Sequence, residues 1–168
     1  MRFIGFAALL VLAACSDGAG KDETKAADKS KLQLAGGQWE TVSEVTNMTT
    51  EDQGAPAMKA ETGRKTTISN CVGEAEGKKP PAAVLAGLDD ASCQYQNIYM
   101  SKGRLNASMT CTRPGLSGNI LVSTQGTYTD KSFDLTSNSR TLLATDGDIS
   151  FDSKVTGRHT GACTPAAT

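Results

Sequence analysis

The stretch CQYQNIYMSKGRLNASMTC, residues 93–111, decides the fold. Cysteines and apolar side chains fall on alternate positions on both sides of Ser101-Lys102-Gly103, with polar residues between them. A period of two is typical of a half-buried β-strand. A three-residue loop that contains glycine is typical of a bulged hairpin. The segment therefore predicts an antiparallel hairpin with one face in the core.

The hairpin also predicts a register, because residues equally distant from Lys102 should lie opposite each other. The predicted pairs on the core face are Cys93 with Cys111, Tyr95 with Met109 and Tyr99 with Leu105. A slip of one residue would turn every one of these side chains to the other face.

The rest of the chain body continues this pattern of short strands and tight turns. Strands are predicted over 38–48, 58–71, 118–129, 132–143 and 148–159. Turns are predicted at Pro114-Gly115, at Asp130-Lys131 and around Asp146-Gly147. Pro80-Pro81 precedes one short helix over 82–88, because proline suits the first turn of a helix. The expected fold is all-β: an antiparallel meander of about seven strands closing as a small barrel or sandwich.

The N-terminal stretch MRFIGFAALLVLAAC, residues 1–15, has the layout of an export signal. Its apolar run is too short to span a bilayer. The ending Leu12-Ala13-Ala14-Cys15 resembles a bacterial lipobox, which predicts a signal peptide over 1–14 and a palmitate-carrying lipid anchor on Cys15. An ordinary secretory signal, with Cys15 incidental, is the alternative. Ser16 follows the cysteine instead of aspartate, which implies the outer membrane, facing the periplasm.

Composition divides the remaining chain into a linker and one domain. Residues 15–34 mix charges of both signs with Ala, Gly and Ser, which predicts a disordered linker. Residues 35–168 have the length of a single domain. Loss of Arg2 with the signal leaves 16 Lys and Arg against 18 Asp and Glu. Such a balance, without a clustered basic face, argues against a nucleic-acid partner.

Four cysteines remain beside Cys15, and an even number in an oxidising compartment predicts two disulfides. Three pairings are possible. The hairpin register selects Cys93–Cys111, which leaves Cys71–Cys163. The sequence contains no Cys-x-x-Cys and no Cys/His cluster, so neither a metal nor another cofactor is expected.

Catalytic patterns are lacking in the sequence. His159 is the sole histidine and is predicted to be an exposed strand-end residue instead of a general base. Asp89-Asp90 and Asp146-Gly147-Asp148 fall in predicted turns, where aspartate is common for local reasons. No nucleophile elbow or phosphate loop is present. The chain is therefore expected not to be an enzyme.

Spaced landmarks across residues 36–163 resemble a bacterial periplasmic family known as a domain of unknown function, DUF3617. They are Gly37-Gln38-Trp39-Glu40, Cys71-Val72, Cys93 with Cys111, and Gly157-Arg158-His159-Thr160-Gly161-Ala162-Cys163. Trp39 is interpreted as a core anchor at the start of a strand. The family has no assigned activity, so the resemblance implies no catalytic or binding residue.

Together these features predict a non-enzymatic, lipid-anchored envelope protein that is a binding or structural module. Its partners would be the membrane, through Cys15, and an envelope protein, glycan or lipid. An inhibitor of lysozyme or of a protease is the alternative.

Overall fold

The computed structural model describes residues 32–145 and 147–163. The predicted signal peptide, Cys15 and Asp146 lie outside these residues. The strands are β1 (Gly37–Thr50), β2 (Lys65–Val72), β3 (Ser92–Ser101), β4 (Arg104–Thr112), β5 (Gly118–Tyr128), β6 (Ser132–Leu143) and β7 (Ile149–Gly161). Between β2 and β3 lie the 3₁₀ turn η2 (Glu74–Glu76) and the short helix α1 (Ala82–Ala86).

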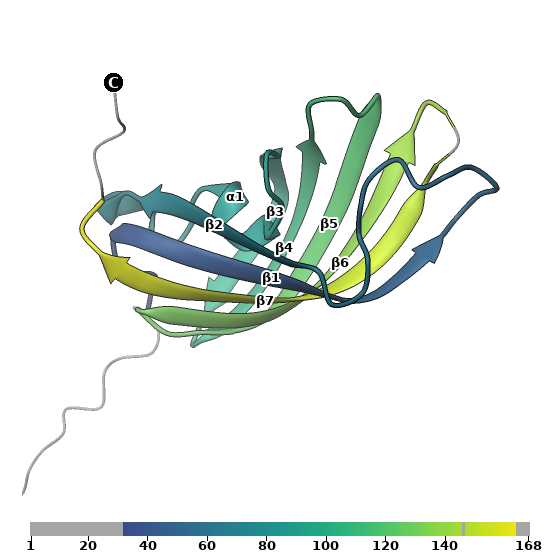
Figure 1. Ribbon diagram of the computed structural model, residues 1–168. Coiled ribbons are helices and arrows are strands. Elements are labelled where there is room, and N and C mark those ends of the chain that lie inside the picture. Colours follow the sequence, from purple (N-terminus) through teal and green to yellow (C-terminus); the bar gives the residue numbers. More distant parts are fainter. Residues whose placement is uncertain (1–31, 146, 164–168) are drawn as a thin grey trace, which may run out of the picture.

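The seven strands form one antiparallel sheet in the order β2-β1-β7-β6-β5-β4-β3. The sheet curves into a half-barrel with α1 on its concave side (Figure 1). The prediction of an all-β antiparallel fold with about seven strands, one short helix and two disulfides is confirmed. The half-barrel stays open along one side, where β2 and β3 are the edge strands.

The number of strands explains the open side. Each strand is antiparallel to its neighbour, so in an odd-numbered sheet the two edge strands run in the same direction. Strands that run in the same direction need a long connection that returns the chain along the molecule. Residues 73–91, which include η2 and α1, make this return between β2 and β3. The helix ends at Gly87, whose left-handed backbone (φ 66°) is a common C-terminal cap.

An aromatic cluster anchors the core at one end of the half-barrel. Trp39 is fully buried and stacks on Phe133, with ring centroids 5.6 Å apart. Phe133 lies over Gly157, the residue opposite it on β7. A Cβ on this glycine would lie 2.0 Å from the phenyl ring, so the ring occupies the space that a side chain would need. The interpretation of Trp39 as a core anchor agrees with this packing.

Hydroxyl groups form a polar row within the core. Thr124, Ser137 and Ser153 lie opposite one another on β5, β6 and β7 and are at most 4% exposed. Their hydroxyls have no hydrogen-bond partner among the described residues. Thr41 on β1 is equally buried, but its hydroxyl donates to the Val84 carbonyl of α1 at 3.0 Å. The same residue type is therefore satisfied at one position and unsatisfied at another.

The β3–β4 hairpin corrects part of the predicted register. Ser101 and Arg104 flank a two-residue turn, in which Lys102 (φ 51°) and Gly103 (φ 79°) both have positive φ, as a type I′ turn requires. The predicted three-residue loop and the Tyr99–Leu105 pair are therefore wrong. Tyr99 instead lies opposite Asn106 and is 60% exposed.

A compensating bulge restores the predicted register further along the hairpin. The bulge lies between Tyr95 and Asn97 and adds one residue to β3. It returns Tyr95 to its position opposite Met109 and Cys93 to its position opposite Cys111, as predicted.

Two element boundaries also differ from the prediction. The second strand begins at Lys65, not at residue 58, and residues 51–64 form a loop. The predicted disordered linker ends too late, because Leu34 is fully buried and its N–H donates to the Gly77 carbonyl at 2.9 Å. One apolar residue among charged ones is too weak a signal to mark the start of a domain.

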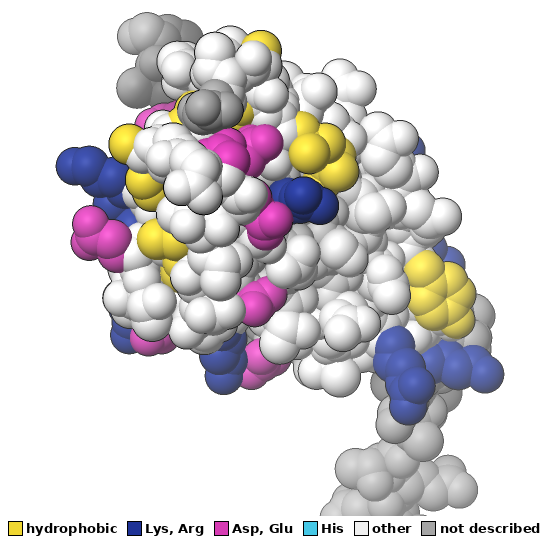
Figure 2. Space-filling view, turned by 90° about the vertical axis from the view of Figure 1, so that its right-hand side faces the viewer, with side chains coloured by type: hydrophobic (Ala, Val, Ile, Leu, Met, Phe, Trp, Pro, Cys, Tyr) yellow, Lys and Arg dark blue, Asp and Glu magenta, His cyan; other side chains and the backbone are white. Residues whose placement is uncertain are grey.

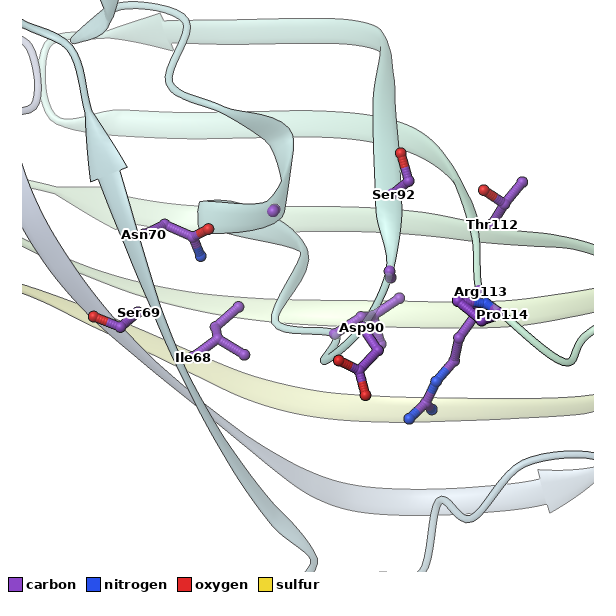
Figure 3. A pocket seen from close by; sticks show the side chains of 11 residues that line it. Ile68, Ser69, Asn70, Asp90, Ser92, Thr112, Arg113 and Pro114 are labelled. Carbon is purple, nitrogen blue, oxygen red and sulfur yellow. The ribbon is translucent and has the colours of Figure 1, made fainter. Parts of the chain in front are cut away.

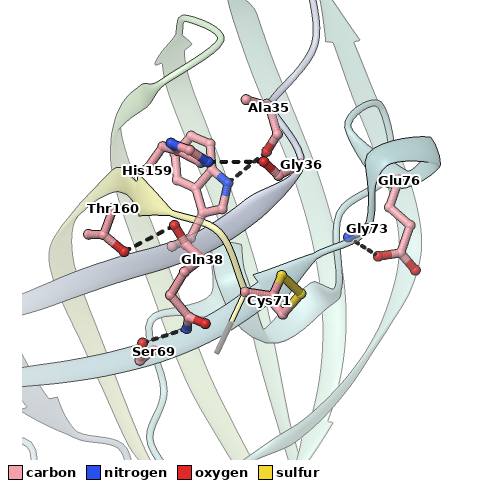
Figure 4. Close-up of a disulfide and its surroundings, with 11 residues drawn as sticks. Ala35, Gly36, Gln38, Ser69, Cys71, Gly73, Glu76, His159 and Thr160 are labelled. Atoms are coloured by element: carbon pink, nitrogen blue, oxygen red, sulfur yellow. Dashed lines mark hydrogen bonds between the residues drawn. A yellow bond between two sulfur atoms is a disulfide. The ribbon is translucent and has the colours of Figure 1, made fainter. Parts of the chain in front are cut away.

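The two disulfides each attach an edge strand to the sheet. Cys71 of β2 is bonded to Cys163, which follows β7, with the Cα atoms 5.4 Å apart (Figure 4). Cys93 of β3 is bonded to Cys111 of β4, with the Cα atoms 4.0 Å apart. These are the pairs that the hairpin register predicted.

Candidate functional site

A cleft of about 680 Å³ lies on the open side of the half-barrel, between β2, α1 and the start of β3 (Figure 3). We call it the edge cleft and define it by the side chains of Ile68, Asn70, Ala83, Ser92 and Arg113. The cleft follows from the odd number of strands. The two edge strands run in the same direction and leave a gap between them, and the returning chain fills this gap only in part.

The β2 wall of the edge cleft follows strand alternation. Ile68 and Asn70 point toward the returning segment, whereas Ser69 points to the other side of the strand (Figure 3). The Asn70 amide has no hydrogen-bond partner among the described residues. A carboxamide offers both donors and an acceptor, so it can bind polar atoms of a ligand.

Arg113 lies where the edge cleft meets a second, smaller cleft of about 300 Å³. Its guanidinium is held by Asp89, with Nη2 3.1 Å from the carboxylate, and its side chain is 21% exposed. Arg64 lies 4.0 Å from the other oxygen of the same carboxylate. Lys59 also lines the smaller cleft, and Asp90 lines the edge cleft. This end of the site therefore carries charges of both signs.

Both clefts lie toward the far end of the barrel, which we define by the β1–β2 loop (51–64) and the β4–β5 turn (113–117). In a view of this end, acidic and basic side chains are interspersed and hydrophobic ones form small separate groups (Figure 2). Asp52 fixes the loop, because its carboxylate accepts the N–H groups of Gly147 and Asp148 at 2.9 Å. These bonds, with one from Gly54, hold the pKa of Asp52 below its ordinary value.

The opposite end of the barrel holds the sole histidine. Nε2 of His159 lies 2.9 Å from the Gly36 carbonyl oxygen (Figure 4), and the ring meets the Trp39 ring edge-on, with centroids 5.8 Å apart. His159 is half-buried and does not line the edge cleft. It lies in β7, as predicted, but it is not the exposed residue that the sequence predicted, because Trp39 and Gly36 cover part of the ring.

One aspartate of each predicted acidic turn, Asp89 and Asp148, has structural partners. Asp89 bridges the two arginines, and Oδ1 of Asp148 accepts the Thr141 hydroxyl at 2.8 Å and the Leu143 N–H at 3.0 Å. Across residues 32–145 and 147–163, no three His, Cys, Asp or Glu side chains gather as a metal ion would need. None of the helices described is long and apolar enough to cross a bilayer.

Sequence reasoning did not find Asn70, Arg113 or the edge cleft. Arg113 stands beside the Pro114-Gly115 turn, and a charged residue at a strand end before a turn is a weak signal for a site. Asn70 carries no signal of its own, since its role depends on which strand lies across the gap.

Comparison with known proteins gives one match. The model of a family described as "Protein of unknown function (DUF3617)" matches residues 34–163. No curated protein matches the chain, and no solved structure does.

Proposed function

We propose that this chain, which belongs to the DUF3617 family, is a non-enzymatic binding module held at the outer membrane by a lipid on Cys15 and facing the periplasm. The edge cleft, about 680 Å³ in volume, carries the proposal because it is large enough for a ligand and combines apolar, amide and charged groups.

The packing of the interior supports a site at the edge. Side chains of the described residues fill the concave side of the sheet, among them Trp39, Leu85 and Met109, each at most 1% exposed. The helix adds Val84 to this core, which is fully buried. A ligand therefore meets the protein at the open side and not inside the barrel.

The position of the edge cleft suits a tethered protein. The described residues start at Leu32, at the end of the barrel that lies away from the β1–β2 loop. There the Tyr128 hydroxyl donates to the Leu32 carbonyl at 3.0 Å. Arg113 lies toward the far end. A lipid anchor upstream of Leu32 would attach the domain to the membrane through the end opposite Arg113.

Replacing the anchor residue tests the attachment. Cys15→Ser should release the protein from the membrane fraction, because an unacylated chain lacks the buried methylenes that hold it there. Membrane association of this variant after carbonate washing would contradict the lipid anchor.

A photoreactive amino acid in place of Ser92, an exposed residue of the edge cleft, tests binding in intact cells. The matched control carries it in place of Ser123, an exposed residue on the outer face of β5. Irradiation should give a defined adduct from the first position and not from the second. Equal adducts from both positions, or none from the first, would contradict binding at the edge cleft.

Inhibition of lysozyme or of a protease is the second proposal, and the β1–β2 loop favours it. The loop projects beyond the strands (Figure 1), and the bonds of Asp52 attach its first part to Gly147 and Asp148, which reduces the entropy lost on binding. The full chain carrying Cys15→Ser should then slow the clearing of cell walls by lysozyme or the turnover of a protease substrate. Undiminished rates of both would reject this proposal.

A further inference from the structure

The two edge strands of the half-barrel present unpaired main-chain groups to the gap between them. Unpaired N–H and C=O groups along a strand edge are a template for another strand. The groups that face the gap follow from the pairing of each edge strand with its single neighbour.

On β2, these groups belong to Thr67 and Ser69. Val45 of β1 exchanges backbone hydrogen bonds with the β2 side: its N–H donates to the Arg64 carbonyl at 3.0 Å, and its carbonyl accepts the Gly63 N–H at 2.7 Å. The register then runs unbroken along β1 and β2. By the alternation of an antiparallel ladder, Ile68 faces β1, and Thr67 and Ser69 face the gap. Their main-chain groups have no partner among the described residues.

On β3, the disulfide identifies the groups that face the gap. The Cα atoms of Cys93 and Cys111 are 4.0 Å apart, which is the close spacing of a non-hydrogen-bonded pair. The N–H and C=O of Cys93 therefore point away from β4, and those of Tyr95 do so two residues later.

We propose that an extended peptide segment of a partner protein binds in the edge cleft as an eighth strand between β2 and β3. The inference rests on the proposed function, for which it names the class of partner. Because β2 and β3 run in the same direction, one added strand of opposite direction is antiparallel to both. The added strand changes an odd sheet, which cannot close with antiparallel pairs alone, into an even one.

The floor of the edge cleft sets the chemistry of the segment. Ala83 and Leu88 lie beneath the gap, and Ile68 adds an apolar wall. Successive side chains of a strand point to opposite faces. Every second residue of the segment therefore faces this floor and is small and apolar. Because α1 contacts both edge strands and limits the open length between them, the segment is short.

The β2 edge lacks the side chains that usually protect an edge against added strands. Natural sheets protect their edges with lysine, proline or inward-pointing charge. Lys65 stands at the first position of β2, and the residues from Thr66 to Val72 are uncharged and include no proline. A protected edge would carry such a residue near Ser69, where the main chain is open.

A displayed library of random linear peptides tests the proposal on the full chain carrying Cys15→Ser. Ser69→Pro removes the N–H that faces the gap without removing a bond to β1, and proline is tolerated on such an edge. Ser69→Ala is the matched control, because it loses the hydroxyl and its hydrogen bond from Gln38, as Ser69→Pro does, but keeps the main-chain N–H. Selected peptides should bind wild type and Ser69→Ala alike and lose affinity by about tenfold or more with Ser69→Pro. Equal affinity for all three proteins, or no enriched peptide, would overturn the proposal.

Amide hydrogen exchange in the wild-type chain gives a readout that needs no variant. A bound peptide should slow exchange at Thr67 and Ser69, while the amides of the β5–β6 pair stay unchanged. Protection elsewhere, without protection of these two amides, would overturn strand addition. The Ser92 adduct is a separate result, so binding at the edge cleft survives a failure of strand addition and is lost only if that adduct fails.

Discussion

The wall from β4 through β7 to β1 and the open side between β2 and β3 are stabilised in different ways. Every strand of the wall has a hydrogen-bonded neighbour on both sides, whereas β2 and β3 have one neighbour each. Each of these two edge strands carries a disulfide cysteine, and α1 packs behind them. The comparison shows that the chain adds covalent links where the ladder stops. The main-chain groups left free there are the ones available to a partner.

The largest expected difference is between the two disulfides. The Cys71–Cys163 bond joins residues 92 positions apart, and its removal with two alanines should lower the free energy of unfolding by about 4–5 kcal/mol. The Cys93–Cys111 bond joins residues 18 apart, and its removal should cost about 3 kcal/mol or less, because the hairpin ladder remains. Urea unfolding of both double variants measures the difference. A larger loss for the hairpin bond would contradict this account of the edges.

Gly157→Ala tests the packing of the wall. The new methyl group would overlap the Phe133 ring, which Trp39 holds in place, so the free energy of unfolding should fall by about 2–3 kcal/mol. Phe133→Leu in the same chain should make the added methyl group less costly, and a double-mutant cycle measures this coupling. Additive effects would mean that the two side chains do not compete for the space.

Two buried threonines differ in their hydrogen bonding, because the hydroxyl of one has a partner and the hydroxyl of the other has none. Thr41→Val removes the bond to Val84 that joins α1 to β1, and should destabilise the protein by about 1 kcal/mol. Thr124→Val replaces a buried hydroxyl that has no partner, and should raise stability by about 1 kcal/mol. Thermal or urea unfolding gives both values. A loss of stability in the Thr124 variant would mean that its hydroxyl is satisfied.

The smallest expected effect is a change in how stability depends on pH, and it comes from Asp52 in the β1–β2 loop. The lowered pKa of Asp52 adds stability above the pKa that this group has in the unfolded chain. That stability is lost as the pH falls through the folded-state value, in the acid range below about pH 4. Asp52→Asn should flatten the fall in unfolding free energy over this range, measured by urea titrations at several pH values. An unchanged slope would show that the carboxylate is not held by the backbone N–H groups.

Much of the wall was predictable, because its strands obey the period of two. The hairpin gave the Cys93–Cys111 pair, and elimination gave Cys71–Cys163. The error at Tyr99 arose because the turn has two residues instead of the predicted three. A bulge beside Tyr95 then adds one residue to β3. The two changes cancel at the cysteines, so the disulfide prediction survived a wrong loop.

The open side was harder to predict, because it depends on how distant segments meet. The odd number of strands could be counted from the sequence, and it implies parallel edges. The depth of the edge cleft depends on where α1 packs, and that packing depends on buried contacts such as Thr41 with Val84. Arg113 and Asn70 come to line the same cleft only after β2 and β4 have been placed around the barrel.

Hydrogen–deuterium exchange of the full chain in isolated cell envelopes, compared with the detergent-purified chain, tests the central claim most directly. If the open side binds a partner in the envelope, peptides that cover β2 (Lys65–Val72) and the start of β3 should exchange more slowly in the envelopes. Peptides from β5 and β6 should exchange at the same rate in both samples. Identical exchange of β2 in the two samples, or protection confined to the wall, would contradict the account.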